Sequence, residues 1–261
     1  MAKLRSRIVH SPWEEVLPQL KPRSVGLVFT DAPYEQKYLS QVPGDTRWNS
    51  RGKSQNKFDR PMKGDHPGGV YWDGLLYEVN RVLKNNAFLV IHASHALMLN
   101  LRPGIFADHG FKLQGCITWR KGSAIGGNLT SAMKRSAEPV LYLSKGTPKL
   151  NPIEVERNGE WVKRDRIDEV LDWQFSLPRD ERCGVPTQKP VALCEQVINL
   201  MSRPGDLVLD PFAGSGSICL AARNLGRRYI GVEVDPKTFR LMKARLNGTP
   251  RASRSAPAIR A

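Results

Sequence analysis

The sequence predicts an α/β fold with a doubly wound, mostly parallel sheet. Short apolar runs typical of strands alternate with longer segments whose apolar residues recur at helical spacing, and this alternation is typical of a parallel sheet with helices on both faces. Two strands also end in an aspartate followed by a turn, in LVFTDAPY at 27–34 and LVLDPFAGSGS at 207–217. Because ligands of such sheets bind at the carboxyl ends of strands, both ends are candidate site segments.

The first half of the chain carries the first of these strand ends. Residues 24–30 predict a buried strand, and residues 71–83 a helix with its apolar residues on one face. Asn85 and Asn86 are expected to end this helix in the left-handed conformation. Three more apolar runs predict strands at 87–93, 113–119 and 138–144.

The second half carries the glycine-rich turn. Pro190 is expected to occupy the first position of a helix that runs to Met201. The strand at 207–210 then leads through the turn into another helix. A strand at 227–235 and a helix at 236–246 complete the pattern.

Length, charge and cysteine content bound the class of protein. The chain has 261 residues, and residues 1–246 predict one large domain. Its net charge of +15 indicates a polyanionic partner. No apolar run is long enough to span a membrane and no signal peptide is visible, so we expect a cytoplasmic protein. The four cysteines form no C-x-x-C pair and indicate a reducing compartment. No metal site is expected, although His92 and His95 are three residues apart.

Three segments fall outside the strand and helix pattern. Residues 35–68 interleave basic and aromatic residues, which suits contact with phosphates and bases; a mobile insertion is the alternative. Residues 145–185 are a candidate target-recognition element, and residues 247–261 predict a disordered basic tail. The expected DNA contacts come from 35–68 and from the basic segment after the strand at 113–119: Arg51, Lys53, Lys57, Arg120, Lys121, Lys134 and Arg135.

The glycine turn indicates a nucleoside ligand. Gly214 and Gly216 let the backbone approach a ligand, and Glu233 at the end of the next strand can accept hydrogen bonds from ribose hydroxyls. Asp210 could meet an ammonium group, and Phe212 could pack on the ligand. These features favour a nucleoside that carries an amino acid.

The DAPY turn indicates a site for an amino group. Asp31 and the carbonyl of Ala32 can both accept hydrogen bonds from one amine, and Tyr34 can stack on the ring that bears it. Such an amine is paired in a duplex, so the base must leave the stack. An ordinary strand-to-loop turn is the alternative reading of these four residues.

Taken together, the two motifs resemble the beta group of DNA amino-methyltransferases, which methylate adenine N6 or cytosine N4. In that family an (Asp/Ser)-Pro-Pro-(Tyr/Trp/Phe) motif precedes the donor motif, as DAPY precedes DPFAGSG here. PTQKPVAL at 186–193, RRYIGVEVD, ITWRKG and RSAEPVLYLSKG are also similar to family segments. The resemblance covers about residues 5–246 and implies a Rossmann-like methyltransferase fold with a basic loop insertion.

The resemblance implies S-adenosylmethionine as the cofactor and assigns roles to individual residues. Glu233 would hold the ribose, while the rest of the donor site would comprise Asp210, Phe212, Gly214, Gly216, Thr187 and Lys189. The catalytic segment would be Asp31, Ala32, Pro33 and Tyr34. The family usually has proline where Ala32 stands; Pro33 still restrains residue 32 to extended geometry.

The expected function is direct methyl transfer to adenine N6 of a flipped-out base at a specific site in double-stranded DNA. Adenine is implied because Asp, rather than Ser, opens the motif. Cytosine-N4 transfer and an inactive DNA-binding protein are the alternatives. A nicotinamide oxidoreductase is disfavoured because Cys219 replaces the third glycine of its fingerprint. A homodimer is possible, and a restriction endonuclease partner is left open.

Overall fold

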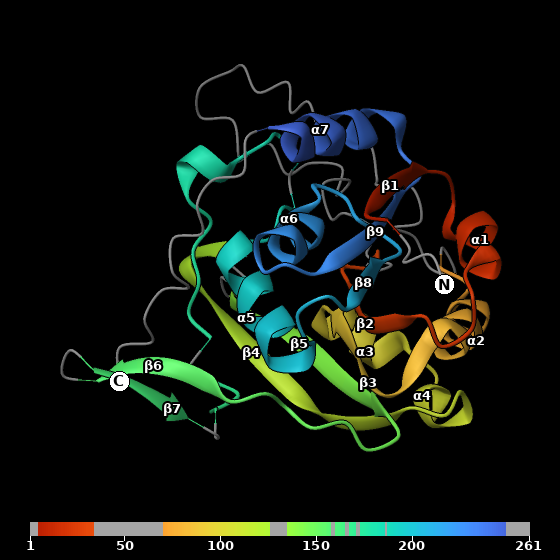
Figure 1. Ribbon diagram of the computed structural model, residues 1–261, viewed down its shortest axis with the longest axis horizontal. Coiled ribbons are helices and arrows are strands. Elements are labelled where there is room, and N and C mark those ends of the chain that lie inside the picture. The colour runs from red at the N-terminus through yellow and green to blue at the C-terminus, as the bar shows by residue number, and fades with distance from the viewer. Residues whose placement is uncertain are drawn as a thin grey trace, which may run out of the picture.

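A mostly parallel sheet organises the computed structural model, which describes residues 5–33, 70–125, 135–157, 160–164, 167–170, 173–185 and 187–248 (Figure 1). Seven strands follow in the order β1-β9-β8-β2-β3-β5-β4. Neighbours from β1 to β3 pair in parallel, whereas β5 is antiparallel to β3 and β4. The doubly wound sheet predicted from the sequence is confirmed. The strands are β1 (Arg7–His10), β2 (Val25–Thr30), β3 (Leu83–His92), β4 (Lys112–Ile125), β5 (Arg135–Lys145), β8 (Leu207–Asp210) and β9 (Arg228–Glu233).

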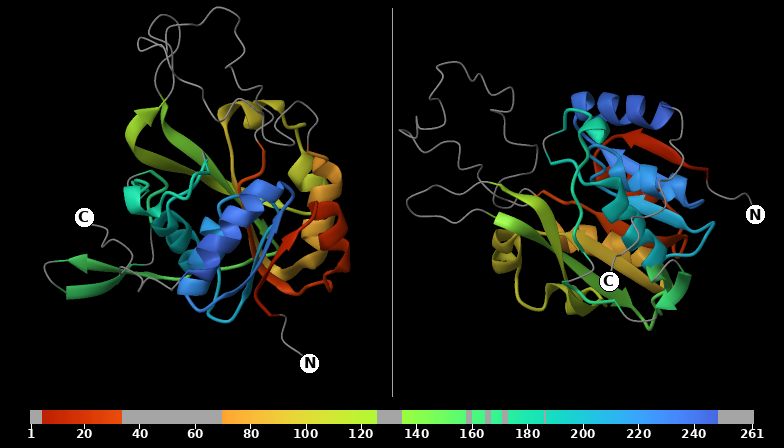
Figure 2. Two further views of the ribbon diagram at one scale, coloured as in Figure 1. Left: turned by 90° about the horizontal axis from the view of Figure 1, so that it is seen from above. Right: turned by 90° about the vertical axis from the view of Figure 1, so that its left-hand side faces the viewer.

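Helices cover both faces of the sheet (Figure 2). One face packs against α1 (Trp13–Val16), the 3-10 helix η1 (Leu17–Gln19), α2 (Trp72–Val82), α3 (His95–Asn100) and α4 (Ile105–Asp108). The other face packs against α5 (Val191–Met201) and α6 (Ser217–Asn224). Strand β2 serves both layers, because Val28 lies in the first core and Phe29 in the second. The last helix, α7 (Pro236–Asn247), packs on a smaller cluster around Met242.

Several predicted boundaries differ from the structure: the strands predicted at 87–93, 113–119 and 138–144 are longer, and two helix ends differ. Helix α2 ends at Val82 and β3 begins at once with Leu83. Asn86 does adopt a left-handed φ of 55°, but inside β3 rather than at a helix end. Pro190 precedes α5 in extended conformation, with ψ of 137°, instead of occupying its first turn. An extended residue at this point is the usual geometry of the position before a helix.

The segment from 145 to 185 has two parts. The strands β6 (Ile153–Arg157) and β7 (Glu160–Arg164) form a separate two-stranded sheet that projects from the body of the protein (Figure 1). Near its base, the amide of Asn151 donates to the carbonyls of Asn199 and Ser202 at the end of α5. The chain then returns along β4, where the backbone N–H of Arg120 donates to the carbonyl of Trp173 at 2.7 Å. Trp173 is buried there and belongs to the second core.

The thiols and the helices bear on two of the predictions from composition. The four cysteines are free thiols; Cys194 and Cys219 are buried, whereas Cys116 and Cys183 are half-buried. Within the described ranges, no helix combines the length and the apolar character that a membrane crossing requires.

Candidate active site at the ends of β2 and β8

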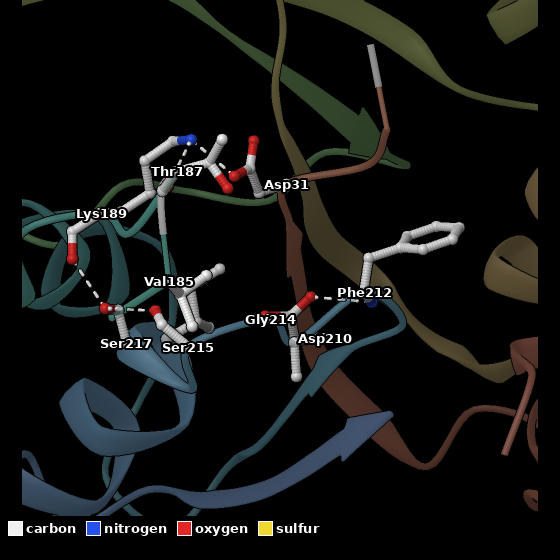
Figure 3. Close-up of a pocket in the computed structure, with 11 residues that line it drawn as sticks. Asp31, Val185, Thr187, Lys189, Asp210, Phe212, Gly214, Ser215 and Ser217 are labelled. Atoms are coloured by element: carbon white, nitrogen blue, oxygen red, sulfur yellow. Dashed lines mark hydrogen bonds and ion pairs between the residues drawn. The ribbon is translucent and has the colours of Figure 1, made fainter. Parts of the chain in front are cut away.

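The two aspartates singled out in the sequence lie at the carboxyl ends of neighbouring strands. Strands β2 and β8 pair in parallel, with Val28 opposite Leu209, so Asp31 and Asp210 come to the same edge (Figure 3). The hydroxyl of Thr30 donates to Asp210 Oδ1 at 2.9 Å and ties the two strand ends together. Both strand ends therefore open onto one site.

Asp210 is buried at this edge. Its Oδ1 also accepts the backbone N–H of Phe212 at 3.1 Å. Burial raises the pKa of Asp210 to about 8, against the opposing effect of these two hydrogen bonds. A carboxyl group of this pKa is poised to ionise when a cation arrives.

The glycine turn brings Glu233 to the same edge. Glu233 Oε2 accepts the N–H of Gly214 at 2.9 Å, and Oε1 accepts the N–H of Asp235 at 2.8 Å. Burial raises the pKa of the Glu233 carboxyl. Each oxygen keeps a further lone pair for hydroxyl donors.

The two glycines of the turn serve different purposes. Gly214 has a φ of 50° and lines the cavity, where a Cβ would meet nothing closer than 3.9 Å. Gly216 has a φ of 74°, and a Cβ there would lie 2.8 Å from the Met242 side chain. The sequence interpretation that both glycines face a ligand therefore fits Gly214, whereas the described contacts of Gly216 are with α7.

A cavity joins the two strand ends (Figure 3). Three segments contribute to its lining: the end of β2, residues 185–189 and the turn after β8. The lining residues are Asp31, Val185, Thr187, Lys189, Asp210, Phe212, Ala213, Gly214, Ser215, Ser217 and Ile218. Six of the residues predicted for the catalytic and donor sites are among them, and Glu233, which is not, accepts the N–H of Gly214.

Lys189 contacts the first strand end directly. Its Nζ lies 2.5 Å from Asp31 Oδ2, and its side chain is only 6% exposed. The hydroxyl of Ser217 donates to the Lys189 carbonyl at 2.6 Å, which fixes the backbone of this residue against α6. The resemblance implied a place in the donor site for Lys189; in the structure its ammonium lies against Asp31 of the DAPY segment.

The remaining predicted residues have mixed outcomes. Ala32 is buried and Pro33 half-buried. Arg120 is exposed on β4, whereas Lys121 pairs with Glu138 and lies 5.2 Å over the Trp119 ring, so its ammonium is engaged within the protein. Arg135 begins β5. Outside the described residues lie Tyr34, Arg51, Lys53, Lys57 and Lys134, together with the whole loop at 35–68 and the tail from 249.

Three residues of the site were not predicted from the sequence. Thr30 supports Asp210, Glu138 pairs with Lys121, and Arg245 on α7 donates to Ser217 Oγ at 2.8 Å and to the Ser215 carbonyl at 3.1 Å. The sequence places Arg245 in a basic helix, and nothing in its spacing indicates a contact with the glycine turn. Within the described part of the chain, no group of three or more His, Cys, Asp or Glu side chains is placed to hold a metal ion.

The comparison with family models identifies the chain. A model described as DNA methylase (N6_N4_Mtase) matches residues 25–244, which include both strand ends. The chain belongs to this family of DNA amino-methyltransferases.

Individual relatives agree with this assignment. The chain is 28% identical to the type II methyltransferase M2.DpnII of Streptococcus pneumoniae, over 92% of this chain and 88% of that protein. It is 27% identical to M2.MboI of Moraxella bovis, over 88% of this chain and 84% of that one.

Solved structures share the fold. The structure of PvuII DNA methyltransferase, which is cytosine-N4-specific, superposes with a TM-score of 0.68 at 19% identity, over 99% of this chain and 92% of that one. The complex of M1.HpyAVI with SAM has a TM-score of 0.63 at 24% identity, over 93% and 99%. At these identities the likeness concerns the fold alone.

Proposed function

We propose that this methyltransferase transfers a methyl group from S-adenosylmethionine to adenine N6 in double-stranded DNA. The methyl donor is that of the family, and the chain acts on DNA as the family does. The observation that carries the proposal is the hydrogen bond between Thr30 and Asp210, which joins the end of the DAPY strand to the end of the donor strand. A donor held at one end and an amine held at the other would therefore meet within one cavity.

The donor side fits a nucleoside that carries an amino acid. Glu233 would accept hydrogen bonds from the ribose hydroxyls, through lone pairs that its two backbone N–H partners leave available. Asp210 would ionise to meet the ammonium of the methionine end, with Thr187 nearby in the lining. Phe212 and Gly214 would line the path between these two ends.

The target side would hold the exocyclic amine. The Asp31 carboxylate and the Ala32 carbonyl would each accept one N–H, and Tyr34 would stack on the flipped base. S-adenosylmethionine supplies an electrophilic methyl group on a sulfonium centre. The amine nitrogen forms the new N–C bond as the C–S bond breaks, and the nitrogen then releases one proton. Asp31 would stabilise the positive charge that develops on the nitrogen.

The choice of adenine rests on Asp31, because Asp at the first motif position goes mostly with adenine in this family and Ser with cytosine. Mass spectrometry of digested DNA from cells that express the protein tests the choice. We expect N6-methyladenine without N4-methylcytosine, and cells without the gene provide the background. N4-methylcytosine alone would move the assignment to cytosine, and neither base, with the donor bound, would indicate an inactive DNA-binding protein.

A further inference from the structure

Four charged side chains of alternating sign run from β4 to the end of β2. Lys121 on β4 pairs with Glu138 on β5, and Lys189 pairs with Asp31 at 2.5 Å. Between these two pairs, Glu138 Oε2 lies 3.9 Å from Lys189 Nζ. The four groups come from four separate segments of the chain; Asp31 and Lys189 line the cavity, whereas Lys121 and Glu138 are not among its lining residues.

The two pairs are separated by the distance between Glu138 Oε2 and Lys189 Nζ, and no hydrogen bond within the described part of the chain bridges it. Glu138 Oε2 is fully buried and has no hydrogen-bond partner among the described residues. A separation of 3.9 Å is too long for a hydrogen bond, and a buried carboxylate oxygen without one costs free energy. Movement of Lys189 Nζ by about 1 Å would close the gap to hydrogen-bond distance.

Lys189 also donates to the neutral Thr187 carbonyl at 3.3 Å, which does not replace the charge of a carboxylate, so Lys189 needs a second carboxylate to release Asp31. The Lys189 side chain is 6% exposed, and a buried ammonium that loses its carboxylate is strongly destabilised. Yet Asp31 has to accept the target amine in the proposed function, and a carboxylate already bound by an ammonium is a weaker acceptor. Glu138 is placed to resolve this conflict, because its Oε2, which has no hydrogen bond among the described residues, lies 3.9 Å from the same ammonium.

We propose that Glu138 is a positioning residue, which takes over the Lys189 ammonium when the target amine engages Asp31. This inference rests on the proposed function, since it assumes that Asp31 binds the amine. Lys121 holds the other oxygen of Glu138 and so fixes the carboxylate in place for the exchange. The exchange moves a hydrogen bond between two carboxylates and leaves the charge of each group unchanged.

Three further titratable groups interact electrostatically with this series: Asp210 on β8 and Cys194 on α5, which lie toward Asp31 and Lys189, and His92 on β3. His92 is the one of these three with a low pKa. It is buried between the rings of Phe29 and Trp119, with ring centroids 5.3 and 6.1 Å away. Burial, reinforced by the charge of Lys189, holds the pKa of His92 well below its usual range. His92 is therefore neutral and does not compete with Lys189 for Glu138.

The test is the single-turnover rate of methyl transfer in Glu138→Gln, at saturating donor and DNA. We expect the rate to fall by about ten- to a hundredfold, the effect of losing a hydrogen bond to a charged group. Donor and DNA affinities should stay within about twofold of wild type. Glu78→Gln is the matched control, because Glu78 forms a part-buried ion pair with Arg81 on α2, away from the cavity, and should keep the wild-type rate.

A double-mutant cycle with Lys189→Met tests whether Glu138 acts through Lys189. Without the ammonium, Glu138 has no group to accept from Asp31. Adding Glu138→Gln to Lys189→Met should therefore change the rate by less than about twofold. A decrease that persists in the Lys189→Met background, or that is explained by weaker binding, overturns the proposal.

Glu138→Asp keeps the charge and should keep more of the rate than Glu138→Gln; equal decreases overturn the proposal. If Glu138→Gln does not fold, Glu138→Asp carries the test: a lower rate at unchanged affinities supports the proposal and a wild-type rate overturns it. If the wild-type protein methylates DNA and Glu138→Gln is equally fast, the role of Glu138 is refuted, and the proposed function is not. A wild-type protein that transfers no methyl group refutes the proposed function instead.

Discussion

The two halves of the site are held by different kinds of interaction. On the donor side, backbone N–H groups of residues 212, 214 and 235 fix the carboxylates of Asp210 and Glu233. On the target side, Asp31 pairs with the long side chain of Lys189. Backbone donors are set by the fold, whereas a lysine side chain can exchange partners through rotamer changes. In the proposed function, the donor side is thus preorganised, and the target side can respond to what binds.

The largest expected effect separates catalysis from donor binding at Asp31. Asp31→Asn keeps the size of the side chain but removes its charge, so the developing cation on the amine loses its stabilising partner. We expect methyl transfer, measured with a tritiated donor, to fall by at least about a hundredfold. Donor affinity should be unchanged. Asp108→Asn, in an exposed ion pair with Arg102, is the control, and a nearly active Asp31→Asn protein would contradict the role of Asp31.

The next effect concerns the donor side at Glu233. Glu233→Gln retains the shape but weakens both ribose contacts, and such charge-assisted bonds are worth about 1.5–3 kcal/mol. The donor dissociation constant from titration calorimetry should therefore rise by about ten- to a hundredfold. Equal affinities in mutant and wild type would remove Glu233 from the donor site. Glu15→Gln on α1, whose carboxylate accepts from Ser11, serves as the control.

The pKa of about 8 at Asp210 predicts a pH dependence of donor binding. Its carboxyl must lose a proton to meet the ammonium, so donor affinity is weakened as the pH falls below that pKa. Between about pH 5.5 and 7.5, affinity should rise with pH by up to about tenfold per unit. Asp210→Asn, which cannot ionise, should bind weakly at every pH and show no such rise. A wild-type affinity that is flat over this range would contradict the role of Asp210.

DNA contact by the loop at 35–68 remains a prediction from the sequence. Replacing Arg51, Lys53 and Lys57 with Ala should weaken binding to all DNA sequences alike. The slope of log affinity against log salt should fall by about 0.9 for each phosphate that the variant no longer neutralises. Fluorescence anisotropy at several salt concentrations measures this slope, and an unchanged value would exclude these residues from the interface.

The smallest effect concerns stability in the glycine turn. Gly216→Ala adds a Cβ 2.8 Å from Met242 to a left-handed residue, whereas Gly226→Ala, at a φ of 69°, adds one with nothing within 4 Å. The left-handed conformation alone costs an alanine about 1–2 kcal/mol. Gly216→Ala should therefore lower the free energy of unfolding by more than Gly226→Ala in urea titrations. Equal decreases would show that the Met242 side chain moves away from the new Cβ without a further loss of stability.

The sequence by itself determined the sheet. It also determined that the ends of β2 and β8 lie together at one edge. Apolar runs that alternate with helical periodicity specify β2, β3, β8 and β9, because burial on both faces leaves a pattern that local residues carry. That Asp31, Asp210, Gly214 and Glu233 lie at one edge could be predicted, because their positions follow from strand ends and turn chemistry; their roles stay predictions. The short elements β1, α1, α3 and α4 were missed, because a periodicity needs more than one turn or a few alternations to be visible.

Only the tertiary structure decided which side chains support the site. Thr30 donates to Asp210, which is 180 residues away in sequence. Glu138 lies near Lys189, 51 residues away, and Arg245 donates to Ser217, 28 residues away. Lys121 was predicted to contact DNA because it lies in a basic segment, yet its ammonium pairs with Glu138 inside the protein. Nothing in local sequence encodes these pairings, since a charge or a hydroxyl can face solvent as readily as a partner. The pairing is fixed when the strand order places β4, β5 and β2 at one edge and burial removes water as the alternative partner.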